Sequence, residues 1–274
     1  MAILYIDPDS RYHGRVRSDE ARRRRIGVVA GLQNRNPTGK ERPNVKPRTA
    51  YKLTAGAMSV VNWLRANVDL FMLLGMAIVV AAGWLAAELA DEVLEGSAQK
   101  YDEWILRHLR TPGSMTDPIG PKWFEDLWRD VTSLGSFAVL TLVSIACGGY
   151  LLMQRRRRTL AFLAVATLGG LGVSLLLKNA FARPRPEFAS DATYVLTSSF
   201  PSGHSMLSAI VYLTLGALLA RTSGRYRQKV YFVAMAMVVT LLVGFSRVYL
   251  GAHYPTDVLA GWSFGLIWAL LCWL

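Results

Sequence analysis

The stretch "TLAFLAVATLGGLGVSLLL", residues 159–177, decides the fold class of this chain. It is an apolar run of the length that a helix needs to cross a lipid bilayer. It leads directly into "KNAFARPRP", residues 178–186, which contains three cations. Charged groups beside hydrocarbon are energetically costly, so they are seldom without a role. The two segments together predict a membrane-spanning helix with a polar site at one end.

Five further runs of this kind occur in the chain, which has 274 residues and is 52% hydrophobic. Their apolar residues are continuous and do not alternate with polar ones, which favours helices over a β-barrel. We therefore expect an all-α polytopic membrane protein whose six transmembrane helices form a bundle. Gly261 and Gly265 form a GxxxG pair, typical of close helix packing. The expected spans are about 69–90, 134–153, 159–177, 204–220, 230–247 and 257–274.

Basic residues are concentrated in three segments beside these spans. The segments 1–67, 154–158 and 221–229 hold 14, 4 and 4 of the 31 Lys and Arg residues. The connection 88–133 holds 5, against 10 Asp and Glu residues. With six spans the three basic segments lie on one side, which the positive-inside rule makes cytoplasmic. We expect a bacterial cytoplasmic membrane protein with both termini in the cytoplasm and the acidic connection outside.

The regions outside the spans differ in character. Residues 1–67 are expected to form a basic, partly disordered cytoplasmic tail with an interfacial helix near 51–66. The net charge of +12 is explained by topology and contact with anionic lipids, because the Arg-rich run lacks the aromatic residues that nucleic-acid stacking uses. No nucleic-acid partner is expected. Residues 68–274 are expected to form one membrane domain.

This membrane domain contains an outer insert at about 91–133, between the first two spans. Segments 101–110 and 122–131 each place aromatic and apolar residues largely on one helical face. We expect two interfacial helices with their Trp residues at the level of the lipid headgroups. These helices could also line an entrance for a lipid.

Four cations remain after the basic segments and the outer connection are counted. They lie at the expected outer ends of spans, where snorkelling toward lipid phosphates is the ordinary explanation. In the stretch 178–186, Pro184 and Pro186 stop the helix and favour an extended path. Arg183 is expected to be a headgroup contact or a bystander. The four cations are Lys178, Arg183, Arg185 and Arg247.

The second polar cluster is "SSFPSGHSM", residues 198–206, between the third and fourth spans. Ser202 and Gly203 lie where the fourth span begins, and His204 follows in its first turn. A helix start offers unpaired N–H groups and the positive end of the helix dipole, which bind anions. A simple serine cap with an incidental histidine is the alternative.

The third cluster is "SRVYLGAHYPTD", residues 246–257, between the fifth and sixth spans. Pro255 suits the first position of the sixth helix, so Asp257 falls in the first turn, near enough to orient His253. A carboxylate that holds a histidine ring fixes its tautomer and raises its basicity. The alternative is a helix-terminal carboxylate beside an interfacial histidine. Arg247 lies in the same cluster.

All three clusters lie on the expected outer side, and together they suit a tetrahedral oxyanion. Two of the chain's four histidines lie in them. Metal-assisted phosphatases need several carboxylates near the phosphate, whereas these clusters offer Asp257 and, nearby, Glu187 and Asp191. We therefore expect metal-free chemistry, with Lys and Arg in place of Mg²⁺ and no cofactor.

These residues resemble the three-part signature of the type 2 phosphatidic acid phosphatase superfamily. The resemblance covers about 134–274 and includes every position of the signature, in order and between the expected spans. Arg183 falls outside the spacing. The signature reads Lys178, six residues, Arg185-Pro186; then Pro201-Ser202-Gly203-His204; then Ser246-Arg247, five residues, His253, three residues and Asp257.

The resemblance implies a six-span helical core and metal-independent release of phosphate from a lipid phosphate. It implies that His253 is the nucleophile and forms a phosphohistidine, that Asp257 holds and activates His253, and that His204 protonates the leaving alkoxide. The residues that it implies for gripping the phosphoryl oxygens are Lys178, Arg185, Arg247, Ser202 and Gly203.

Several functions share this signature. The expected substrate is a phospholipid or polyprenyl phosphate: phosphatidic acid, phosphatidylglycerophosphate or undecaprenyl diphosphate. A phosphotransferase that passes the phosphoryl group to another lipid would carry the same residues. A non-catalytic lipid-binding or scrambling bundle and a haloperoxidase holding vanadate are less consistent with complete motifs and six spans. The sequence leaves the oligomeric state open.

Overall fold

The computed structural model describes residues 70–188 and 198–274, and these residues form helices joined by short connections. The tail 1–67, the helix expected near 51–66 and Asp191 lie outside the described residues. The helices are α3 (Leu70–Glu95), α4 (Gln99–His108), α5 (Lys122–Ser133), α6 (Phe137–Met153), α7 (Arg157–Ala164), the π-helix η2 (Val165–Gly169), α8 (Gly170–Ala180), α9 (Gly203–Thr222), α10 (Tyr226–Tyr249) and α11 (Pro255–Trp273).

The described helices provide five candidate spans, and a bent pair of helices provides a sixth. Five helical segments are long and apolar enough to cross a membrane: Met72–Glu95, Arg157–Ala180, Gly203–Thr222, Tyr226–Tyr249 and Pro255–Trp273. The candidate for the sixth span is the pair α5 and α6, which is bent by 45° at the break between the two helices. Helix α6 alone has 17 residues, which is short for a hydrocarbon core of about 30 Å, so residues of α5 are counted with it. The expectation of an all-α polytopic membrane fold is confirmed.

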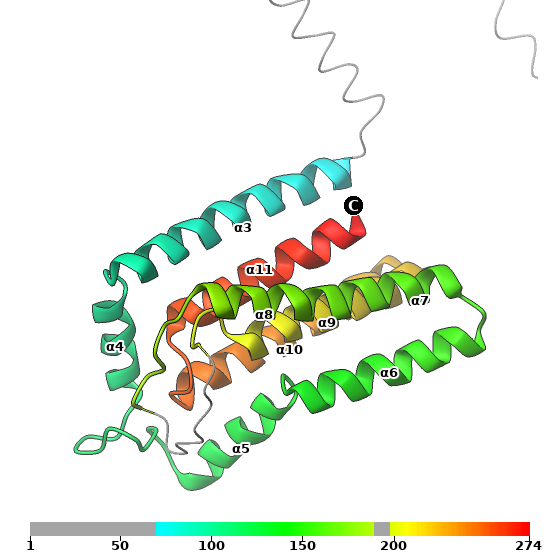
Figure 1. Cartoon of the computed structure of the whole chain (residues 1–274). Helices are drawn as coiled ribbons and strands as arrows, with labels where there is room; N and C mark the ends of the chain where they lie inside the picture. Colours follow the sequence, from blue (N-terminus) through cyan, green and yellow to red (C-terminus); the bar gives the residue numbers. More distant parts are fainter. Residues whose placement is uncertain (1–69, 189–197) are drawn as a thin grey trace, which may run out of the picture. The chain divides into compact units, whose positions relative to one another are not determined.

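Helix α9 lies in the middle of the bundle. It packs against α10 and α11, and α11 packs in turn against α3 (Figure 1). In the most apolar stretch of α9, 44% of the residues are buried within the protein, against 17% for α3. The GxxxG pair allows the close contact of α11 with α9, because a Cβ on Gly261 would lie 2.8 Å from the Ser202 carbonyl oxygen and one on Gly265 2.7 Å from that of Met206.

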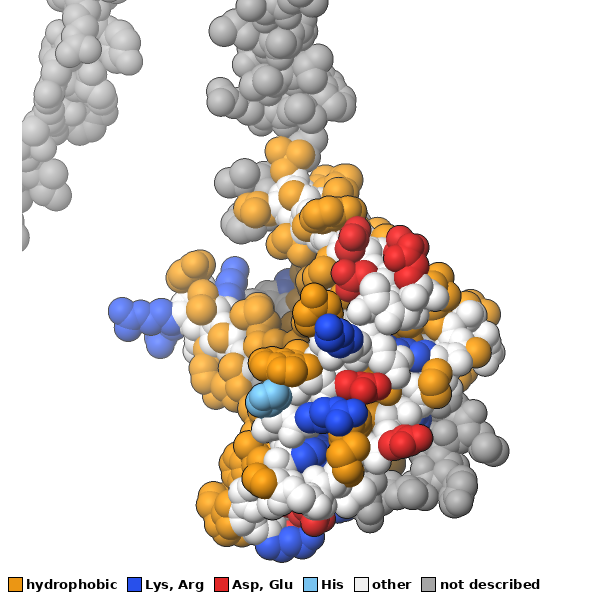
Figure 2. All heavy atoms as spheres, turned by 90° about the vertical axis from the view of Figure 1, so that its left-hand side faces the viewer, with side chains coloured by type: hydrophobic (Ala, Val, Ile, Leu, Met, Phe, Trp, Pro, Cys, Tyr) orange, Lys and Arg blue, Asp and Glu red, His pale blue; other side chains and the backbone are white. Residues whose placement is uncertain are grey.

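One end of the bundle collects the polar clusters. The end of α8, the start of α9, the end of α10 and the start of α11 lie there, next to α4 and α5 (Figure 1). Figure 2 looks onto this end, where basic and acidic side chains gather between apolar flanks. The basic connections 154–158 and 221–229 lie at the opposite end.

The outer insert forms two helices, as expected, but its details differ from the expectation. Helix α3 continues to Glu95, so the acidic residues just after residue 90 belong to a helix. In α4 the buried side chains are Asp102 and Leu106, whereas Tyr101 is 74% exposed and Trp104 60% exposed. The aromatic side chains therefore point away from the protein, and α4 contacts the bundle through a face that contains a carboxylate.

Candidate active site

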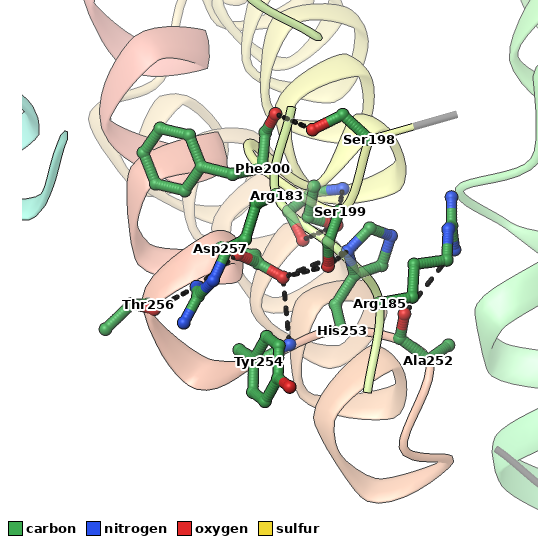
Figure 3. Close-up of polar contacts among 12 residues, drawn as sticks. Arg183, Arg185, Ser198, Ser199, Phe200, Ala252, His253, Tyr254, Thr256 and Asp257 are labelled. Atoms are coloured by element: carbon green, nitrogen blue, oxygen red, sulfur yellow. Dashed lines mark hydrogen bonds and ion pairs between the residues drawn. The ribbon is translucent and has the colours of Figure 1, made fainter. Parts of the chain in front are cut away.

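Asp257, in the first turn of α11, lies at the centre of the polar end. Its Oδ2 accepts a hydrogen bond from the Tyr254 backbone N–H at 3.0 Å and one from the Ser199 hydroxyl at 2.5 Å. The same oxygen is 3.4 Å from Nδ1 of His253 (Figure 3). Both Asp257 and His253 are almost completely buried. Because Nδ1 faces the carboxylate, the remaining ring nitrogen, Nε2, is available for chemistry.

The environment of His253 favours its neutral form. Burial lowers the pKa of His253 from 6.5 to about 4, and Arg247 adds to this effect while the hydrogen bond with Asp257 opposes it. An imidazole that is neutral at pH 7, with Nδ1–H directed at a carboxylate, carries a lone pair on Nε2 and can act as a nucleophile.

Lys178 and Arg185 are anchored to backbone carbonyls beside this histidine. Lys178 Nζ donates to the Ser198 carbonyl at 2.9 Å, and Arg185 Nη1 donates to the Ala252 carbonyl at 3.4 Å. The positive charges of Arg185 and Arg247 are close enough to Lys178 to repel its charge. Like charges repel, so their convergence indicates a site for an anion.

Arg247 completes the cationic side, His204 lies near it, and both residues lie next to the junction between α5 and α6. Arg247 Nη1 donates to the Thr132 hydroxyl at 3.2 Å, while its buried Nε has no hydrogen-bond partner. Gly135, at this junction, lies close to His204: a Cβ added to it would lie 3.3 Å from the His204 ring and closer still to Cγ1 of Val243, so a larger residue would displace its neighbours. The junction of α5 and α6 therefore lies next to two of the predicted site residues.

The start of α9 joins the other two clusters. The Ser202 side chain caps the helix by accepting from the Ser205 N–H at 3.5 Å, and the Ser202 N–H donates to the Asp257 carbonyl at 2.9 Å. A Cβ on Gly203 would lie 3.2 Å from Cε of Lys178. The Lys178 side chain thus lies against Gly203, and a larger residue at position 203 would displace that side chain.

Arg183 has a different role from the one expected. It is buried, with 9% of its surface exposed, and its guanidinium forms ion pairs with Asp257 at 2.7 Å and with Asp102 at 2.8 Å. It also lies over the Tyr254 ring, 4.2 Å from the centroid. The expectation of a headgroup contact or a bystander is wrong, because both of its terminal nitrogens are directed inward toward carboxylates.

Asp102 connects this network to the outer insert. Its Oδ1 accepts from the Thr256 backbone N–H at 3.1 Å, and its Oδ2 accepts from the Thr256 hydroxyl at 2.5 Å. Burial raises the pKa of Asp102, and hydrogen bonds from Thr256 and Arg183 offset part of that rise. Although burial opposes the charge of Arg183, the two carboxylates raise the pKa of Arg183 above its usual value. The network is thus a buried guanidinium held between two carboxylates.

Within residues 70–188 and 198–274, no three His, Cys, Asp or Glu side chains are grouped closely enough to hold a metal ion. The side chains of the site place three cations on one side and the Asp257 network on the other.

Comparison with known proteins identifies the family of the chain. Residues 158–274 match the model of the PAP2 superfamily. Phosphatidylglycerophosphatase B of Bacillus subtilis is 36% identical over 153 residues, which cover 54% of this chain and 73% of that protein. This chain belongs to the PAP2 superfamily.

Two further similarities extend this PAP2 assignment. A lipid A 1-phosphatase of Rhizobium etli is 32% identical over 183 residues, covering 56% of this chain and 74% of that protein. The crystal structure of a transmembrane PAP2-type phosphatidylglycerolphosphate phosphatase from Bacillus subtilis superposes with a TM-score of 0.64 at 29% identity, covering 71% of this chain and 93% of that one. The membrane-embedded PAP2 fold thus covers more of the chain than the matched segment alone.

The structure brings all eight predicted site residues of this PAP2 protein to one end of the bundle. Sequence reasoning missed the supporting residues around them. A signal existed for two: Ser199 lies inside the second cluster, and Asp102 is a carboxylate on the same helical face as Leu106. The supporting residues that were missed are Asp102, Thr132, Gly135, Arg183, Ser199 and Thr256.

Proposed function

We propose that this PAP2 protein removes a phosphate group from a membrane lipid, without a metal ion and through a phosphohistidine on His253. Its family makes it a lipid phosphatase. The observation that carries the proposed mechanism is the buried His253 held by Asp257 beside the cations Lys178, Arg185 and Arg247.

In the first step the phosphoryl oxygens bind the three cations and the N–H groups at the start of α9. Nε2 of His253 attacks phosphorus and forms a P–N bond as the bond from phosphorus to the lipid oxygen breaks. Protonated His204 gives its proton to the departing oxygen, a contribution of about 10²- to 10⁴-fold for a positioned acid. Asp257 stabilises the positive charge that develops on the His253 ring.

In the second step His204, now neutral, takes a proton from water. The water oxygen attacks phosphorus, the P–N bond breaks, and its electron pair returns to Nε2 of His253. Inorganic phosphate leaves, and His204 is protonated again for the next cycle. Dividing the transfer into two displacements lets the same cations stabilise the charge of each transition state.

The first substrate to test is phosphatidylglycerophosphate. The relative at 36% identity and the structural neighbour are both named for activity on this lipid. Phosphatidic acid, undecaprenyl diphosphate and a lipid A 1-phosphate, the last suggested by the Rhizobium relative, complete the panel. The same phosphoryl site accepts a monoester or the terminal phosphate of a diphosphate, so the substrate class is set by the lipid portion.

The site is proposed to face the outside of a bacterial cytoplasmic membrane. The Arg-rich connections 154–158 and 221–229 lie at the end of the bundle opposite the site, and the positive-inside rule directs such segments to the cytoplasm. The test is a reporter enzyme that is active only outside the cytoplasm, fused after Gly113 in the α4–α5 connection. This fusion is expected to be active. If the fusion is inactive and a cytoplasmic reporter at the same position is active, the site faces the cytoplasm and the proposed orientation is wrong.

The chemistry is tested with protein purified in detergent and EDTA, using release of inorganic phosphate from each lipid of the panel. His253→Ala is expected to lower the rate by about 10³-fold or more. His108→Ala is the matched control, because His108 is exposed and its ring contacts the Trp104 carbonyl on α4. A labelled phosphoenzyme, quenched in alkali where phosphohistidine survives, should form in the control and be lost in His253→Ala.

Three results would contradict the proposal. Undiminished phosphate release by His253→Ala would exclude the phosphohistidine. Dependence of the rate on an added divalent cation would exclude the metal-free mechanism. Label that passes to an acceptor lipid, with no free phosphate, would identify a transferase that uses the same site.

A further inference from the structure

We propose that Asp102 and Arg183 are positioning residues, which together hold Asp257 against His253 and thereby set the rate of phosphoryl transfer. This inference rests on the proposed function, since it concerns the residue that orients the nucleophile. It gives the outer helix α4 a role in the active site, because α4 supplies the positioning residue Asp102. None of the three signature segments includes α4.

The geometry makes Arg183 the link between the two carboxylates. Nη1 reaches Oδ1 of Asp257 at 2.7 Å, and Nη2 reaches Oδ2 of Asp102 at 2.8 Å. A guanidinium is a rigid planar fork, so fixing one branch on Asp102 also fixes the direction of the other. The Tyr254 ring, 4.2 Å from the guanidinium carbon, restricts the plane further.

Asp102 is itself held by two other bonds, both from Thr256 in the first turn of α11. Thr256 directly precedes Asp257, so the carboxylate from α4 fixes both the helix turn and the arginine that contact the catalytic aspartate. Asp102 is 1% exposed. A buried carboxylate is tolerated when it is paired and hydrogen-bonded, and removal of one partner then has large effects.

The charges explain why this arrangement suits the reaction. Oδ1 of Asp257 accepts a hydrogen bond from Arg183, whereas Oδ2 faces Ser199, Tyr254 and His253. If Arg183 paired with Asp257 alone, it would neutralise the charge that must stabilise the imidazolium of His253. Because Asp102 shares the guanidinium, the three groups keep a net negative charge next to the histidine that becomes positive.

The first test is Asp102→Asn, which keeps an acceptor for the Thr256 N–H and removes the charge. We expect kcat to fall by about 10- to 100-fold, with KM and the inhibition constant for inorganic phosphate unchanged within twofold. The alkali-quenched phosphoenzyme should form more slowly by the same factor. Glu103→Gln is the matched control on the same helix, because Glu103 is paired with Arg107 at the surface and its loss should leave all values unchanged.

The second test asks whether Asp102 acts through Arg183. In a double-mutant cycle, Asp102→Asn should add little to the loss in kcat caused by Arg183→Gln, since one link is already broken. Arg183→Lys keeps the charge but lacks the rigid planar fork that fixes both carboxylates, so it should lose about tenfold in kcat with unchanged phosphate inhibition. This variant carries the test if Asp102→Asn does not fold.

The outcomes are distinguishable from failure of the proposed function. If His253→Ala retains activity, the mechanism is wrong whatever Asp102 does. If His253→Ala is inactive but Asp102→Asn and Arg183→Lys have the kcat of the parent protein, the positioning role is overturned. A change in KM or phosphate inhibition alone would also overturn it, because that would make the pair part of the binding surface. Additive losses in the cycle would show that the two residues act separately.

Discussion

Arg183 and Arg185 stand two positions apart in one proline-rich stretch, yet they belong to different halves of the site. Figure 3 shows them on opposite sides of His253 and Asp257. Arg183 lies between two carboxylates, whereas Arg185 reaches the Ala252 carbonyl on the side of Lys178 and Arg247. Prolines favour the polyproline II conformation, which has three residues per turn, so side chains two positions apart diverge.

The difference shows that the guanidinium group has two different roles in this site. Where carboxylates surround an arginine, its charge is compensated and the group fixes the positions of its partners. Where cations converge, as at Lys178, Arg185 and Arg247, their mutual repulsion is relieved by an anionic ligand. One half of the site is therefore expected to control orientation and stability, and the other half to control phosphate binding and transition-state charge.

The largest expected effect is on the cationic half. Arg247→Ala should lower kcat/KM by about 10²- to 10³-fold, because it removes one cation from the phosphoryl oxygens. Phosphate release from the preferred lipid measures it. Arg107→Ala, on the exposed face of α4, is the control and should keep the parent rate. A loss of less than threefold for Arg247→Ala would remove this residue from the phosphate site.

The comparison itself is tested by the pair Arg183→Gln and Arg185→Gln. Breaking a buried ion pair costs about 3–5 kcal/mol, so Arg183→Gln should lower the thermal midpoint of the detergent-solubilised protein well below that of Arg185→Gln. Arg185→Gln should instead raise the inhibition constant for inorganic phosphate by about tenfold, the cost of one charge-assisted hydrogen bond. If the two variants exchanged these properties, the division of the site into two halves would be wrong.

A smaller effect should appear in the dependence of stability on pH, because His253 lies between the two halves. The unfolded chain binds a proton at His253 near the ordinary pKa of 6.5, while the folded protein binds it only near 4. Stability from this group is therefore present above pH 6.5 and lost as the pH falls toward 4, by on the order of 3 kcal/mol. Thermal midpoints of the parent protein and His253→Gln, compared across this range, should diverge at high pH and converge at low pH. Parallel curves would contradict a neutral buried His253.

The smallest expected effect concerns the support of Arg247 by the bent span. Thr132→Val removes the acceptor for Arg247 Nη1 with little change in shape. A single hydrogen bond contributes about 0.5–1.5 kcal/mol, so we expect a loss of about two- to tenfold in kcat/KM. Thr111→Val, in the α4–α5 connection, is the control. No loss in Thr132→Val would mean that Arg247 is held without the outer insert.

Much of this molecule was predictable from local features. Runs of about 20 apolar residues predict helices in a bilayer whatever their neighbours, and each of the six expected spans has a helical counterpart, the second of them bent. Ser202 and Asp257 were also predictable, since both are defined by their position at the start of a helix. The close approach of Gly135 to His204 and Val243 at the junction of α5 and α6 was not, because it brings together residues from three helical regions that are far apart in the sequence.

The sequence by itself determined the six spans and the eight candidate site residues, because hydrophobic length, charge asymmetry and helix-terminal chemistry act over a few neighbouring residues. Only the tertiary structure decided the function of Arg183, which pairs with Asp102 across 81 residues of chain and with Asp257 across 74. The sequence around an arginine beside prolines is the same whether its guanidinium binds a lipid phosphate or two buried carboxylates. Its role depends on which carboxylates the fold places within hydrogen-bonding distance.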